Sequence, residues 1–210
     1  GARVGTLEPS YVMDFLHKRI IVDCPGFLDT RGNKQNYINA VSIHKNLKGN
    51  FKVMLVTNSA KILGPTKGMC IISQLNTMTE IFPDQDQLKK ALYLVASGEE
   101  NGYDCAKKLK LLVKAGKPTY LSERGYDLIN FLIENPNHLA DFPAPTRIET
   151  DEGIGTYELV GNMKDLIKNN DFVSNPVVNA PRKETIESRD TLRWCSEYGY
   201  DESGDQNKYY

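Results

Sequence analysis

Asp23 and Gly26 are the residues of this chain whose type and spacing best suit chemistry on a phosphate. They follow an apolar run, residues 20–22, which predicts a buried strand that holds Asp23 at its carboxyl end. A carboxylate fixed there can bind Mg²⁺ or one of its water ligands. Gly26 has no side chain, so its backbone N–H can approach a terminal phosphate. The alternative is an ordinary strand followed by a turn at Pro25 and Gly26.

The six residues after Gly26 form the segment whose conformation Asp23 and Gly26 would control. They are Phe27, Leu28, Asp29, Thr30, Arg31 and Gly32. Because glycines bracket a polar stretch, we expect a switch loop that a bound phosphate would order. A solvated turn containing Asp29 and Arg31 is the competing interpretation.

Strands and helices alternate through the middle of the chain, which is the arrangement that would position these residues. Apolar, β-branched runs predict strands over 52–57 and 91–96. Apolar residues at three- and four-residue steps predict helices over 36–47 and 66–82. This order indicates a three-layer, doubly wound α/β fold with a mostly parallel sheet, and it places ligands at the carboxyl ends of the strands.

The following part of the chain has weaker patterns. Residues 84–90 predict a polar connector or a helical turn, and residues 139–145 predict a short last strand that prolines end. Further helices are expected over 104–113, 123–134 and 157–168.

The end of the chain differs in composition from the rest. From Ser174 onward, Asn, Pro, Ser, Asp and Glu leave few candidates for a core. We therefore expect a partial domain over 1–173 and a flexible tail over 174–210. Trp194 and the tyrosines near it allow a second interpretation, a segment that contacts a partner.

Composition and charge give no sign of a nucleic-acid or membrane protein. The formal net charge is −1 and the isoelectric point is about 6.4, so no overall positive field attracts nucleic acid or acidic lipid. No apolar run is long enough to span a bilayer. The 4 cysteines lie far apart, which favours thiols in a reducing, cytoplasmic compartment over zinc sites or disulfides. Cys24 is interpreted as a packing residue, the 3 histidines form no cluster in the sequence, and no residue is assigned a catalytic role.

With the motif and the alternation in agreement, residues 18–170 resemble a G domain of the P-loop GTPase class. The closest likeness is to the divergent 50S ribosome-binding GTPases of protists and to immunity-associated GTPases. The resemblance implies GTP and Mg²⁺ as ligands. It implies that Asp23 binds Mg²⁺ through water and that Gly26 senses the γ-phosphate. It also places Ser97 and Glu100 at the site that reads the base.

Two features depart from the pattern of this family. The family begins with Gly-x-x-x-x-Gly-Lys-Ser/Thr, which holds the β- and γ-phosphates, and no such segment occurs in this sequence. We therefore expect either that the N-terminal third of the domain is absent from the sequence or that the fold has lost it. Where the family has Asn/Thr-Lys-x-Asp, this chain has residues 97–100, Ser-Gly-Glu-Glu. Glu100 can replace the acid, whereas Gly98 cannot flank a purine, and a surface turn is the alternative.

Three functions remain open from the sequence. The first is a GTP-binding switch domain, which is a GTPase if the parent protein carries a phosphate loop. The second is a degenerate, inactive G domain that binds a protein partner or a second copy through its switch faces. The third is another doubly wound enzyme with an unidentified ligand. We expect this chain alone to bind GTP weakly or not at all.

Overall fold

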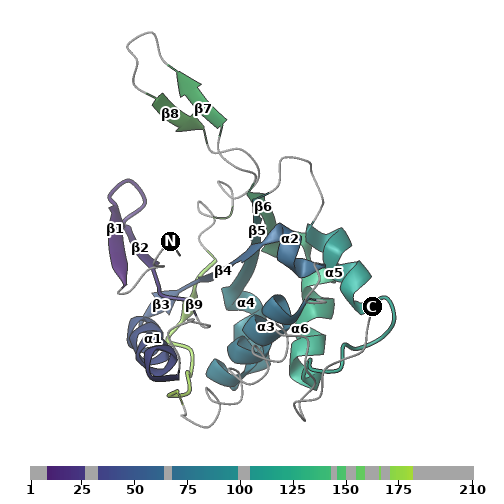
Figure 1. The fold of residues 1–210 in the computed structure, drawn as a ribbon. Helices are drawn as coiled ribbons and strands as arrows, with labels where there is room; N and C mark the ends of the chain where they lie inside the picture. The colour runs from purple at the N-terminus through teal and green to yellow at the C-terminus, as the bar shows by residue number, and fades with distance from the viewer. Residues whose placement is uncertain are drawn as a thin grey trace.

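The computed structural model of the chain is a mixed α/β structure (Figure 1). It describes residues 9–26, 33–63, 68–98, 105–142, 146–149, 155–158, 166 and 171–181. The predicted switch loop over 27–32 and Glu100 lie outside the described residues, as do residues 182–210 of the predicted tail.

The strands are β1 (Ser10–Asp14), β2 (Arg19–Asp23), β3 (Asn50–Phe51), β4 (Val53–Asn58), β5 (Leu92–Ser97), β6 (Leu139–Phe142), β7 (Thr146–Glu149), β8 (Gly155–Glu158) and β9 (Val173–Ser174). The α-helices are α1 (Asn33–Asn46), α2 (Ser59–Ile62), α3 (Met69–Ile81), α4 (Gln85–Ala91), α5 (Cys105–Val113) and α6 (Glu123–Glu134). A 3₁₀ helix, η1 (Pro136–His138), precedes β6.

A parallel sheet with the strand order β4-β5-β6 lies at the centre of the structure. The register places Asn58 of β4 and Phe142 of β6 on either side of Ser97 at the end of β5. Helices connect each pair of these strands, as parallel pairing requires. The α/β class is therefore confirmed, and the strands expected over 52–57 and 91–96 are present with bounds shifted by one residue.

Both faces of β5 are buried, which explains why its sequence is apolar without alternation. Leu92 and Leu94 face the larger core, which α3, α5 and α6 complete. Tyr93 and Val95 face the opposite way and pack with Leu166 in a smaller cluster. Each large apolar side chain buried here contributes roughly 1.5–3 kcal/mol to the stability of the fold, so packing on both faces of β5 stabilises the sheet.

Polar side chains cap the first turns of α4 and α6. The Asp84 carboxylate accepts from the backbone N–H groups of Asp86 and Gln87 at 2.9 and 3.1 Å. This cap explains why α4 is a full helix where the sequence allowed only a connector or a helical turn. The Ser122 hydroxyl accepts from the Gly125 N–H at 3.0 Å and starts α6, whose bounds match the prediction. The helices α1, α3 and α5 are also confirmed, within three residues of their expected ends.

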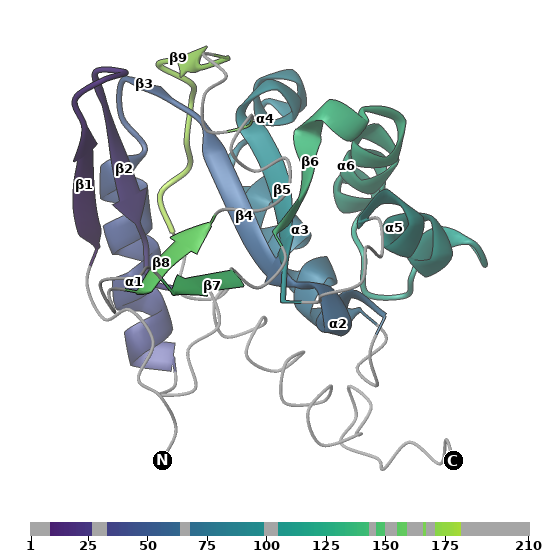
Figure 2. The same ribbon diagram turned by 90° about the horizontal axis from the view of Figure 1, so that it is seen from above.

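The strand that carries Asp23 differs from the expectation. It is β2, and it pairs antiparallel with β1 in a hairpin that forms a sheet of its own. Ile20 and Ile21 are 58% and 44% exposed, so the prediction of a buried strand here is wrong. The local apolar run did not reveal that β1 is the partner of β2 and that the hairpin leaves these side chains exposed. The hairpin lies on the β4 side of the parallel sheet, with β2 nearer to β4 than β1 is (Figure 2).

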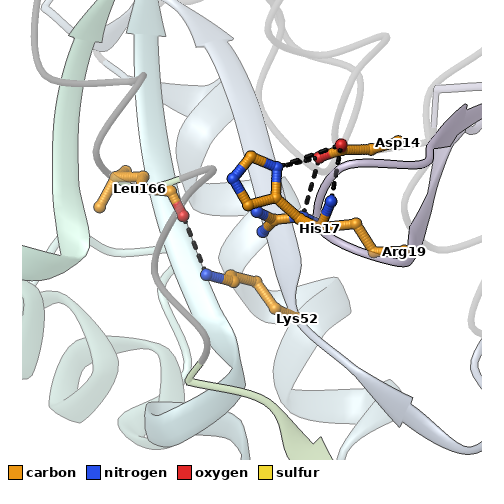
Figure 3. A network of polar contacts seen from close by, with 5 residues as sticks. All are labelled: Asp14, His17, Arg19, Lys52 and Leu166. Atoms are coloured by element: carbon orange, nitrogen blue, oxygen red, sulfur yellow. Dashed lines mark hydrogen bonds and ion pairs between the residues drawn. The ribbon is translucent and has the colours of Figure 1, made fainter.

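Polar groups lie where the hairpin approaches the parallel sheet (Figure 3). Asp14 accepts from Arg19 Nε at 3.1 Å and pairs with the His17 ring at 2.8 Å. Partial desolvation acts to raise the pKa of Asp14, but hydrogen bonds from His17 and Arg19 outweigh it and the pKa lies below its usual value. Lys52, just before β4, donates to the Leu166 carbonyl at 2.9 Å. Burial lowers the pKa of Lys52, and although the charge of Asp171 acts to raise it and that of Arg19 to lower it, the pKa lies below its usual value.

Two predictions in the last part of the chain need correction. Tyr157 belongs to β8, which pairs antiparallel with β7, so the helix expected over 157–168 does not begin there. The pairing with β7 favours a strand, and the helical periodicity of the later residues did not reveal it. Of those residues only Leu166 is described.

The first part of the expected flexible tail packs against the domain. β9 pairs antiparallel with β3. Further along, the Asn179 side chain donates to the Glu80 carbonyl at 2.8 Å and its backbone N–H donates to the Ile81 carbonyl at 2.7 Å. Residues 171–181 therefore lie along the domain rather than away from it.

Candidate functional site

Asp23 is the last residue of β2 and is exposed, and the chain that follows it is held at two points. Pro25, two residues after Asp23, is buried. The side chain of Asn39, which is 1% exposed on α1, donates from Nδ2 to the Gly26 carbonyl at 3.2 Å. Gly26, the residue before the predicted switch loop, is thus hydrogen-bonded to α1, while Asp23 and Gly26 are both exposed.

The fold gives no reason for a glycine at position 26. Its φ angle is not positive, and no described atom lies within 4 Å of the place where a Cβ would stand. By contrast, Gly98 has φ +99°, a conformation that side chains with a Cβ rarely adopt. The backbone therefore explains Gly98, whereas a close approach by something outside the described chain would explain Gly26.

Cys24 lies between the two predicted phosphate and metal residues and is half-buried. Burial raises the pKa of the Cys24 thiol, and the neighbouring Asp23 carboxylate raises it further. A thiol of this kind is a poor nucleophile near neutral pH, so the structure agrees with its interpretation as a packing residue.

Ser97, the predicted base-side residue, lies at the carboxyl end of β5. Its hydroxyl donates to the Thr57 carbonyl at 3.3 Å, which ties the ends of β4 and β5 together. The Gly98 N–H donates to the Phe142 carbonyl at 3.2 Å, so Gly98 extends the pairing with β6. In this geometry the Ser97 hydroxyl serves the sheet, and the next residue that could contact a base, Glu100, lies outside the described residues.

Lys108 is a residue at this edge that the sequence reasoning missed. It lies on α5, is only 6% exposed, and its ammonium group donates to the carbonyl and the hydroxyl of Ser59. The signal was present in the sequence, because Lys108 follows Cys105 by three residues and so falls on the apolar face of α5. Lys108 therefore places a buried ammonium group beside Ser59, the residue that follows β4.

Asp23 and Ser97 belong to two different sheets but lie at the same edge of the molecule. β2 and β4 run in the same direction in Figure 2, so both strands end on the same side. Asp23 ends β2, and Ser97 ends β5 beside β4. The predicted metal residue, Asp23, and the predicted base-side residue, Ser97, therefore lie at a common edge, although Asp23 is not part of the parallel sheet.

The described residues contain no group of three or more His, Cys, Asp and Glu side chains arranged to hold a metal ion. Asp23 is the residue predicted to bind Mg²⁺, and a single protein carboxylate suits an ion whose other ligands are waters and phosphate oxygens. No helix in the described part of the chain is long and apolar enough to cross a membrane. Comparisons with protein families, with curated proteins and with solved structures give no match to this chain.

Proposed function

We propose that this chain is the phosphate-sensing part of a GTP-binding switch domain of the P-loop GTPase kind. Asp23 would hold Mg²⁺ through water, and the Gly26 N–H would contact the γ-phosphate and so order residues 27–32. Gly26 is the observation that carries the proposal. Nothing described in the fold requires a glycine there, whereas a phosphate that approached the backbone N–H would favour one.

The common edge supports the same proposal. Ligands of parallel α/β sheets bind beyond the carboxyl ends of the strands, and β2, β4 and β5 all end on that side. The sequence contains no Gly-x-x-x-x-Gly-Lys-Ser/Thr segment, so the affinity of this chain for GTP should be low.

The test is a titration of the purified chain with a non-hydrolysable GTP analogue, followed by ¹H–¹⁵N NMR with and without Mg²⁺. We expect weak binding, with Kd above about 100 μM, and Mg²⁺-dependent shifts at the amides of Cys24 and Gly26. Asp23→Asn should abolish the Mg²⁺ dependence, whereas the matched change Asp127→Asn, at an exposed position on α6, should not. The proposal is refuted if the analogue, at about 1 mM and in 10-fold excess over the chain, causes no amide shift. It is also refuted if Asp23→Asn shows the same Mg²⁺-dependent shifts as the unchanged chain.

A second candidate function, a degenerate G domain that binds a protein partner, is favoured by one observation. The hairpin exposes apolar side chains on both of its faces, since Val12 pairs with Ile21 on one face and Met13 pairs with Ile20 on the other. Val56 of β4 is also 51% exposed. Two-stranded hairpins are marginally stable alone, and exposed apolar clusters mark interaction surfaces.

For this candidate the simplest partner is a second copy of the chain. Sedimentation equilibrium should then show self-association at about 100 μM or below. The double change Val12→Lys and Ile21→Lys should abolish it, whereas Leu111→Lys, at a 46% exposed position on α5, should not. A chain that stays monomeric over this range would count against self-association through the hairpin.

A further inference from the structure

A hollow of about 420 Å³ lies at the opposite edge of the sheet, near the amino ends of β5 and β6. Helices α4 and α6 and the 3₁₀ helix η1 form its walls. Its lining residues are Asp86, Lys89, Lys90, Phe131, Asn135 and His138. Its volume is at the lower end of the range for small-molecule sites.

His138 is held in one orientation and one tautomer. Its Nδ1 lies 2.8 Å from the Leu92 carbonyl, which can only accept, so Nδ1 carries the hydrogen. The ring stacks on Tyr93 at 4.6 Å and meets the edge of Phe131 at 5.0 Å. Because Nδ1 donates to the Leu92 carbonyl, Nε2 is the ring nitrogen left to contact a ligand in the hollow that His138 lines.

Two lysines of α4 give the hollow a positive charge. The Lys89 ammonium group lies 5.9 Å from the centre of the Phe131 ring. Within the described residues, neither Lys89 nor Lys90 forms an ion pair. Asp86 is the one carboxylate in the lining, so two ammonium groups face one carboxylate. The lining thus offers a net positive charge, an oriented imidazole nitrogen and an aromatic wall.

We propose that this hollow binds a small phosphate monoester. The ammonium groups of Lys89 and Lys90 match the two negative charges of the phosphate. With its hydrogen on Nδ1, His138 offers Nε2 as an acceptor for a P–OH of the phosphate. Phe131 supplies an apolar surface for the organic part. The site lies at the edge opposite to Asp23 and Ser97 and is therefore independent of the proposed GTP site.

Phenyl phosphate is a suitable probe, since it combines the phosphate with a flat apolar body. We expect it to shift the imidazole ¹⁵N signals of His138 saturably, with Kd below about 1 mM. The double change Lys89→Met and Lys90→Met should weaken binding by at least about tenfold. The matched double change Lys110→Met and Lys114→Met, at exposed positions on and after α5, should leave Kd unchanged.

Three results would overturn the proposal. One is the absence of saturable shifts at His138, and another is an equal loss of binding in the Lys110 and Lys114 control. The third is equal affinity for inorganic phosphate, which would remove the role assigned to Phe131. His138→Phe keeps an aromatic ring that can stack on Tyr93 but has no ring nitrogen, so it should also lose binding. Circular dichroism checks that this variant folds. Shifts at Gly26 from a GTP analogue are a separate readout, so failure of one site is distinguishable from failure of the other.

Discussion

Separate replacement of Gly26 and Gly98 by alanine tests whether the fold or a ligand requires a glycine at position 26. Gly98 has φ +99°, and a Cβ there would meet the Asn58 side-chain nitrogen at 3.4 Å. A residue with a Cβ in a left-handed conformation costs about 1–2 kcal/mol, so Gly98→Ala should lower Tm by about 2–8 °C. Gly26 has neither constraint within the described residues, so Gly26→Ala should be neutral or stabilise the chain by up to about 1 kcal/mol.

The assay has two parts, urea unfolding followed by circular dichroism and the NMR titration with a GTP analogue. Gly26→Ala should keep the free energy of unfolding and lose the Mg²⁺-dependent shifts at Cys24, because the methyl group occupies the space that the phosphate needs. Gly98→Ala should lose stability instead. The reasoning is refuted if Gly26→Ala destabilises the chain by more than about 1 kcal/mol, or if it binds the analogue as the unchanged chain does.

Three further predictions concern charge and packing. The pKa of the Cys24 thiol is raised by burial and by the Asp23 carboxylate, so alkylation by iodoacetamide at pH 8 should be slow and Asp23→Asn should accelerate it; an unchanged rate would contradict this. The pKa of Asp14 lies below its usual 3.8, so its stabilising contribution is present at neutral pH and is lost as the pH falls through the lowered value; a ¹³C carboxyl titration midpoint at or above 3.8 would contradict this. Leu94→Ala should cost about 2–5 kcal/mol in urea unfolding, whereas Leu111→Ala should cost under about 1 kcal/mol, and similar losses at both positions would contradict the assigned core.

The sequence predicted best those elements whose residues bury a continuous or regularly spaced apolar surface. β5 is apolar at every position from Leu92 to Ala96 because helices or other side chains cover both its faces, and such a run has few alternatives. Helix α6 combines the Ser122 cap with apolar residues at three- and four-residue steps, so both its type and its bounds were predictable.

The misplaced elements depend on partners that are distant in the sequence or weakly marked. The residues of β2 are as apolar as those of a buried strand, and only the pairing with β1 shows that they form an exposed hairpin. Tyr157 was assigned to a helix because β7, its partner strand, carries no strong signal. Lys108 was overlooked because a charged residue on an apolar helix face is usually assigned to the surface, and its contact with Ser59 is set by the packing of α5 on α2.

The segment over 171–181 changes where the folding unit ends. It supplies the hydrogen-bond donors for the last carbonyl groups of α3 and the partner strand of β3. A chain shortened at residue 170 would leave those carbonyls to water and would lose Val173, which is 9% exposed and pairs with Phe51. The folding unit therefore includes residues 171–181 and continues beyond the last strand of the parallel sheet.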